Sequence, residues 1–203
     1  MEALKNLSPE ADLGVRLATL FHDIGKPKTR TEDSTGEVHF YGHEDVGAAM
    51  AQEIMRRLHY SVDEIKRVST LVSLHMRYGA YQPDVWTDAA IRRLIRAVGD
   101  HRRDLFTIAR VDIAACGVAG VPTADLAGLS ERMETLERAH NIVAATSPLS
   151  GEELMARLSL KAGPILGKLK AVLTDAVVAG ELAPDDKAGA EALARQVLEQ
   201  NGA

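Results

Sequence analysis

Five residues in the N-terminal part of the sequence could together hold a divalent metal ion. They offer imidazole nitrogens and carboxylate oxygens, and they are His22, Asp23, His43, His75 and Asp112. Such donors are the usual ligands of first-row divalent metals, and carboxylates also suit Mg²⁺. A bound ion of this kind lowers the pKa of water enough for hydrolysis near neutral pH. The five residues therefore predict a metal centre, provided that the fold brings them together.

The first pair, His22 and Asp23, is predicted at the C-terminal end of a helix. Apolar residues recur there at helical spacing, and Gly25 and Pro27 end the pattern. The apolar residues are Leu13, Leu17, Leu20, Phe21 and Ile24. Side chains at the end of a helix can converge on a site without interrupting the helix itself.

His43 is predicted to begin the second helix. We expect the inward face of that helix to carry four apolar residues at helical spacing. These residues are Val46, Met50, Ile54 and Leu58. Ser61 and Glu64 then form the pattern of a capping box, which predicts that a third helix starts at Val62.

His75 and Asp112 are predicted on the apolar faces of two later helices, because they follow Val72 and Ile108 at helical spacing. A carboxylate on an apolar face is costly to bury, so Asp112 needs a cation or a hydrogen-bond partner. Each residue alone has an ordinary interpretation, since an inward histidine is more often a hydrogen-bonded core residue than a ligand. The pattern is more informative, because a helical bundle brings the ends and buried faces of successive helices together.

The remaining sequence also predicts an all-α fold. A loop or small hairpin is expected at residues 28–41 and a connecting loop at 77–86. Caps, glycines and prolines predict the later helices: one after Thr87, one after Gly99, one at about 129–146, one after Ser150, one from Pro164 and a last one to about Gln200. The glycines and proline within 117–128 predict a boundary between a helical core, 1–120, and a helical C-terminal region, 121–203.

Composition excludes several classes of protein. The 203 residues are 46% hydrophobic and include no apolar run long enough to span a bilayer. One cysteine excludes a disulfide framework, and with no secretory signal visible we expect a cytoplasmic protein. A net charge of -5 excludes a globally basic surface for nucleic acid. An aromatic content of 4% argues against a base-stacking β-sheet.

The segment LATLFHDIGKPKTR, residues 17–30, resembles the HD motif of the HD-domain metal-dependent phosphohydrolase superfamily. With FYGHEDVGA, VSTLVSLHMR and ARVDIAA, it resembles the HD region of bacterial tRNA nucleotidyltransferases, the CCA-adding enzymes and related poly(A) polymerases. Residues 148–182, PLSGEELMARLSLKAGPILGKLKAVLTDAVVAGEL, resemble the C-terminal segment of those enzymes. The resemblance covers nearly the whole chain and implies an HD-type helical core with a helical C-terminal region.

The resemblance implies a metal-dependent phosphohydrolase with one or two ions of Mn, Ni, Mg, Fe, Co or Zn. His22 and Asp23 match the HD pair, Asp112 the closing aspartate, and His43 and His75 the additional histidines of a two-metal site.

The implied catalytic residues are Asp23 and Lys26, with Lys26 beside the substrate phosphate, where a cation offsets charge on the phosphoryl oxygens. The implied substrates are phosphomonoesters or 2′,3′-cyclic phosphodiesters of nucleotides or RNA 3′ ends.

The sequence departs from the family pattern in two respects. The family carries an earlier histidine, whereas none precedes His22; water or Glu44 is the alternative ligand, and we expect weaker metal binding. The nucleotide-polymerising head, with its G-S-x-x-x-D-x-D motif, has no counterpart, so we expect no CCA addition by this chain alone. Four alternatives are left open: a split protein, a domain fragment, a start assigned too late, and a non-catalytic tRNA-binding body with a degenerate HD site.

Residues 88–103 hold five arginines against two aspartates and could contact RNA phosphates. The arginines are Arg92, Arg93, Arg96, Arg102 and Arg103. The alternative is a solvated helix face, which is the more common role of a charge run. The resemblance adds tRNA as a partner, and the sequence leaves open a separate nucleotidyltransferase subunit and a homodimer.

Overall fold

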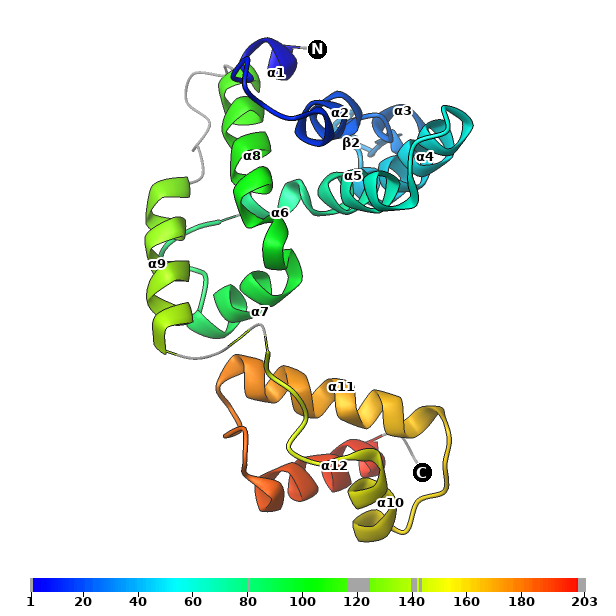
Figure 1. Cartoon of the computed structure of the whole chain (residues 1–203), viewed down its shortest axis with the longest axis vertical. Helices are drawn as coiled ribbons and strands as arrows, with labels where there is room; N and C mark the ends of the chain where they lie inside the picture. Colours follow the sequence, from blue (N-terminus) through cyan, green and yellow to red (C-terminus); the bar gives the residue numbers. More distant parts are fainter. Residues whose placement is uncertain (1, 80, 117–124, 140–141, 143, 201–203) are drawn as a thin grey trace. The chain divides into compact units, whose positions relative to one another are not determined.

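The computed structural model describes residues 2–79, 81–116, 125–139, 142 and 144–200, and within these ranges the regular structure is helical except for two short strands (Figure 1). The predicted all-α class is therefore confirmed. No helix in the described ranges is long and apolar enough to cross a membrane. The chain divides into two compact units, one formed by Met1–Pro83 with Asp100–Leu129 and the other by Asp84–Gly99 with Ser130–Ala203.

This grouping differs from the predicted division between residues 120 and 121. Helix α7 (Asp88–Val98) packs along α11 (Pro164–Ala179), so it belongs to the second unit although it precedes the predicted boundary. Most of the predicted boundary segment, 117–124, lies outside the described residues. The rest of that segment already includes the start of helix α9 (Leu126–Ala139).

The first unit contains a hairpin and a set of helices, several of them short. The helices are α1 (Glu2–Lys5), α2 (Leu13–Phe21), α3 (Lys26–Thr29), α4 (His43–Arg57), α5 (Val62–Leu74), α6 (Met76–Gly79) and α8 (Arg102–Cys116). Strands β1 (Thr31–Glu32) and β2 (Val38–His39) pair antiparallel, with Thr31 opposite His39. They confirm the hairpin predicted within 28–41, although α3 includes its first two residues, and α6 extends into the loop predicted at 77–86.

The buried face of α4 differs from the predicted one. Leu58 is 63% exposed, and Val46, Met50 and Ile54 are only half-buried. The residues that α4 buries are His43, Gly47, Ala48, Ala51 and Met55. The predicted stripe was therefore wrong by about one residue, because small residues occupy the face where α4 comes closest to its neighbours.

Helix α2 shows a similar departure, while α5 follows its prediction. Of the predicted apolar residues, Phe21 is buried, whereas Leu13 and Leu20 are 54% and 46% exposed. Helix α2 also buries Val15, Ala18 and Thr19, which were not predicted. Helix α5 starts after a capping box formed by Ser61 and Glu64, as predicted, and it buries Val72, the apolar residue that precedes His75, together with Val68.

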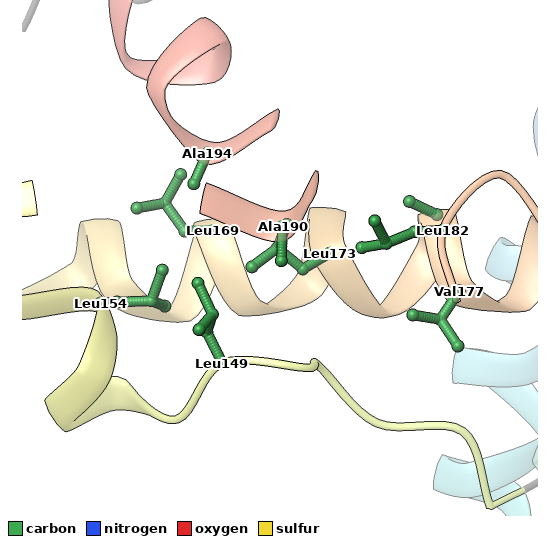
Figure 2. Close-up of a cluster of buried hydrophobic side chains, with 9 residues drawn as sticks. Leu149, Leu154, Leu169, Leu173, Val177, Leu182, Ala190 and Ala194 are labelled. Atoms are coloured by element: carbon green, nitrogen blue, oxygen red, sulfur yellow. The ribbon is translucent and has the colours of Figure 1, made fainter. Parts of the chain in front are cut away.

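The second unit contains α7, most of α9, α10 (Gly151–Leu158), α11 and α12 (Lys187–Gln200). The predicted starts after Thr87 and Ser150 and at Pro164 are confirmed, whereas α9 begins and ends earlier than predicted. Leucines of α11, Leu169 and Leu173, pack with Leu149, Leu154 and the small residues of α12 in one apolar core (Figure 2). The nine buried residues of that core hold α10, α11 and α12 together.

Candidate metal centre

The turn that carries His22 and Asp23 lies against the first turn of α4. Helix α2 ends at Phe21, His22 is its C-cap, and α3 begins at Lys26. A Cβ atom on Gly25 would overlap the carbonyl oxygen of His43 and lie 2.8 Å from the backbone nitrogen of Gly47. Only glycine therefore permits this approach, which places Asp23 beside His43.

The three buried histidines share one local arrangement. The Nδ1 atom of each ring lies within hydrogen-bond distance of the carbonyl oxygen three residues earlier. The pairs are His22 with Thr19 at 2.7 Å, His43 with Phe40 at 2.9 Å and His75 with Val72 at 2.7 Å. Since a carbonyl oxygen only accepts, each Nδ1 carries the proton and donates it. In the neutral ring, the lone pair is then on Nε2, where a metal ion can bind it.

The helix ends explain why His22 and His75 are held in this way. Both are C-caps, of α2 and α5 respectively. The last carbonyl groups of a helix have no partner within it. The two imidazoles satisfy such carbonyls, those of Thr19 and Val72, and their rings are fixed in return. Sequence reasoning missed these acceptors, although the spacing of three residues between ring and carbonyl recurs at all three histidines.

Asp23, His43 and His75 place three donor atoms in one small triangle. The Nε2 atoms of His43 and His75 are 3.3 Å apart, and Oδ1 of Asp23 lies 3.4 Å from the first and 3.9 Å from the second. The point in the plane of these atoms that is equidistant from all three lies about 2.1 Å from each, which matches the usual metal–nitrogen and metal–oxygen bond lengths. The donor set thus fits a first-row divalent ion.

The other carboxylate oxygen of Asp23 faces a second group of side chains. Oδ2 is 3.4 Å from Nε2 of His22 and 2.6 Å from Nζ of Lys26. Nε2 of His22 is in turn 3.2 Å from Oδ1 of Asp112. Asp23 therefore contacts three of the other four predicted ligands, with one oxygen toward His43 and His75 and the other toward His22. Asp112 joins the group through His22.

Electrostatics separates the histidines of the two groups. Burial lowers the pKa of His75, which favours the neutral ring that a metal requires. Burial also lowers the pKa of His22, but the hydrogen bond to Asp112 and the charge of Asp23 outweigh it, and the net pKa is raised. The same hydrogen bond to His22 lowers the pKa of Asp112. The contact between His22 and Asp112 therefore favours the protonated imidazole, and a metal ion bound to Nε2 of His22 has to replace that proton.

The site is buried on its imidazole side and open on its carboxylate side. The side chains of His22, His43 and His75 are 9%, 7% and 2% exposed, whereas those of Asp23 and Lys26 are 37% and 38% exposed. A substrate can therefore approach from the side of the carboxylates and the lysine. The ammonium group of Lys26 also lies 5.8 Å from the centre of the Phe40 ring, a cation–π contact.

Glu44, the predicted alternative ligand, lies on the other side of the His43 ring. Its carboxylate is 3.5 Å from Nδ1 of His43, whereas the metal-facing atom of that ring is Nε2. The structure therefore does not add Glu44 to the donor group.

The five arginines that were predicted to contact RNA are divided between the two units, with Arg102 and Arg103 in the first. Arg92 is half-buried and donates to the carbonyl oxygen of Ala179, and Arg93 pairs with Asp175 at 2.9 Å. These two arginines therefore hold α7 to α11, a role the sequence did not predict.

Arg96 is exposed and donates to the carbonyl oxygen of Ala145. It also lines a cavity of about 310 Å³ with Lys170, Ala171, Thr174 and Asp175. Arg96 and Lys170 are thus the two cationic residues among those that line this cavity.

The helical fold and its group of histidines and aspartates agree with the HD-type core that the sequence resemblance implies. The family model described as "HD domain" matches residues 3–115, more than half of the chain. The chain therefore belongs to the HD domain family.

Curated relatives support the resemblance noted from the sequence. The chain is 36% identical over 199 residues to the "A-adding tRNA nucleotidyltransferase" of Deinococcus radiodurans, an alignment that covers 94% of the chain and 44% of that protein. It is 34% identical over 190 residues to the "CC-adding tRNA nucleotidyltransferase" of Thermus thermophilus, covering 91% of the chain and 40% of that protein. The chain thus spans less than half the length of the curated relatives it matches.

Proposed function

We propose that the chain is a metal-dependent phosphohydrolase module that acts on phosphomonoesters or 2′,3′-cyclic phosphodiesters of nucleotides or RNA ends. The observation that carries this proposal is the position of Asp23. One of its carboxylate oxygens faces two fixed imidazoles, and the other faces His22 and Lys26. The carboxylate of Asp23 therefore links the residues that would hold a metal ion to Lys26, the cation that would bind a phosphate.

Asp23, His43 and His75 would hold the first divalent ion, and His22 and Asp112 would complete a second position. A bound ion supplies Lewis-acid activation of water and of the phosphoryl group. The protein supplies fixed ring orientations, since the Nδ1 protons are bound to backbone carbonyls.

Lys26 would neutralise charge on the substrate. Its ammonium group is partly exposed and is held by Asp23 at 2.6 Å, so it stands at the edge where a phosphate would enter. A cation in this position stabilises the negative charge of the phosphoryl oxygens in the transition state.

The substrate class is argued from the relatives. The names of both relatives describe nucleotide addition to tRNA. Nucleotides and RNA ends are therefore the substrate class that we propose for this chain. Within that class, a hydrolytic centre would act on the phosphate or cyclic phosphate ester at an RNA 3′ end.

The test combines metal content with hydrolysis. The purified chain is expected to bind Mn²⁺, Ni²⁺ or Mg²⁺ and to hydrolyse a 2′,3′-cyclic nucleotide or a nucleoside monophosphate. Asp23→Ala is expected to lose both properties, whereas Asp45→Asn, which removes an exposed acid from the first turn of α4, is expected to keep both. Wild-type metal occupancy in Asp23→Ala would show that the site is wrongly assigned.

A second candidate function is binding of RNA, such as tRNA, without hydrolysis. The cavity lined by Arg96 and Lys170 favours it, because two cations suit a phosphate group and the one acid in the lining, Asp175, is paired with Arg93. A metal-free, inactive protein that still binds tRNA would support this function over the first. Arg96→Ala should then weaken binding and reduce its salt dependence, while Arg138→Ala, which removes an exposed arginine outside the predicted set, serves as the control.

A further inference from the structure

Two aromatic side chains of the hairpin segment, a few residues before His43 of the candidate metal centre, form a stacked pair. The rings of His39 and Tyr41 are 5.0 Å apart between centroids and are inclined by 12°, so they are nearly parallel. Tyr41 is 78% exposed, although one face of its ring is covered by His39. The outer face of the Tyr41 ring is thus a flat aromatic surface open to solvent.

The His39 ring of this pair is held in place by hydrogen bonds within the hairpin. Nε2 of His39 is 3.1 Å from Oδ2 of Asp33. The other oxygen of Asp33 accepts hydrogen bonds from the backbone of Thr35 and Glu37, at 2.8 and 3.0 Å. These bonds fix His39, and His39 in turn supports Tyr41, so that little ordering of the Tyr41 ring is required on binding.

A turn connects the stacked pair directly to the metal centre. The backbone nitrogen of His43 donates to the carbonyl oxygen of Phe40 at 3.2 Å, and Gly42 has the positive φ of 73° that such a turn needs at this position. The same carbonyl also accepts from Nδ1 of His43. Tyr41 is therefore only two residues from a ring of the donor triangle, at most about 7.6 Å between Cα atoms.

We propose that Tyr41 stacks on the nucleobase of a nucleotide whose phosphate is held at the metal centre. This inference rests on the proposed function and adds a determinant of substrate class to it. Aromatic rings bind bases by stacking, and a single exposed ring can do so without a β-sheet platform. The arrangement selects esters that carry a base over base-free phosphates, and purines over pyrimidines because their π-surface is larger.

The test compares a phosphate with and without a base. Binding of adenosine 5′-monophosphate and of ribose 5-phosphate to the intact chain is measured by calorimetry, with Mn²⁺ present and absent. Tyr41→Ala is expected to weaken binding of the nucleotide about tenfold and to leave ribose 5-phosphate unchanged. Tyr41→Phe keeps the ring and is expected to bind like wild type, and Val38→Ala is a control on the same hairpin.

Two results would overturn the inference: equal affinity of the nucleotide for wild type and Tyr41→Ala, or no preference of the wild type for the nucleotide over ribose 5-phosphate. Hydrolysis is measured in parallel, so that the two proposals are judged separately. If no ester is hydrolysed but the preference for the base depends on Tyr41, the stacking role stands and the hydrolase function does not. A 3′-phosphorylated trinucleotide in the same titration distinguishes an RNA end from a free nucleotide as the source of the base.

Discussion

His43 and His75 direct their Nε2 atoms toward each other at 3.3 Å, although 32 positions separate them in the sequence. Neither ring can turn freely, because the Nδ1 atom of each is bound to a backbone carbonyl. Two imidazole nitrogens at this distance cannot both carry protons. A shared cation is the partner that suits two lone pairs together with the nearby carboxylate of Asp23.

The first prediction follows from this pair. His43→Gln and His75→Gln should each weaken binding of Mn²⁺ or Zn²⁺ by more than about 100-fold, because each removes one of three donors, a larger change than loss of a supporting residue. Competition with a coloured chelator measures the affinity, and circular dichroism shows whether the fold persists. His101→Gln should bind like wild type. Equal affinities for all variants would mean that the ion binds elsewhere.

Gly25 is predicted to be essential for the centre because of its contact with α4. Gly25→Ala adds a methyl group where the backbone of His43 and Gly47 already lies, so the turn and the helix must separate. The expected cost in the free energy of unfolding is about 1–3 kcal/mol, the usual range for overpacking, with a loss of metal affinity. Urea unfolding and a metal titration check both effects.

Gly167 of α11 provides the matched control for this substitution. A Cβ atom there meets nothing within 4 Å, and the residue is exposed in the helix. Gly167→Ala should therefore stabilise the chain by about 1 kcal/mol, since alanine has the higher helix propensity. If Gly25→Ala were equally harmless, the close approach of the turn to α4 would be incorrect.

The sequence predicted the elements that carry the site better than the faces these elements bury. Caps such as Ser61 and Ser150 are local patterns, and both were confirmed. The buried face of α4 depends on what packs against it, and no local pattern contains that information. Similarly, helical spacing placed His22 at the end of one helix and Asp112 on the apolar face of another. Their hydrogen bond, between residues 90 positions apart, depends on the tertiary fold and could not be predicted from spacing.

The corrected face of α4 leads to a prediction about stability. Met55 is fully buried, whereas Leu58 is 63% exposed. Met55→Ala should lower the free energy of unfolding by about 2–5 kcal/mol, because it leaves a cavity in the core. Leu58→Ala should change it by no more than about 0.5 kcal/mol, as is usual at the surface. Urea titrations of the two variants distinguish the observed face from the one that hydrophobic spacing predicted, which would reverse the order.

The last prediction concerns pH and the start of α10. The ammonium group of Lys187, at 2.6 Å, and the backbone nitrogen of Ser150, at 2.9 Å, lower the pKa of Glu153 from 4.5 to about 2. A carboxyl group whose pKa is lower in the folded than in the unfolded chain stabilises the folded state at pH values above the unfolded-state pKa. This contribution is lost as the pH falls from the unfolded-state pKa through the folded-state pKa. Glu153→Gln should therefore melt at a lower temperature than wild type at pH 7. The difference should shrink between about pH 4.5 and pH 2.

Glu152 separates this effect from a general loss of negative charge at the helix start. It is the exposed neighbour in the same first turn, so Glu152→Gln removes an equal charge and leaves the contacts of Glu153 with Lys187 and Ser150 in place. Its melting temperature should differ less from wild type at pH 7 than that of Glu153→Gln. A difference for Glu153→Gln that stays constant from pH 7 to pH 3 would contradict the assignment, because the lost contribution would then not depend on ionisation of this carboxyl group.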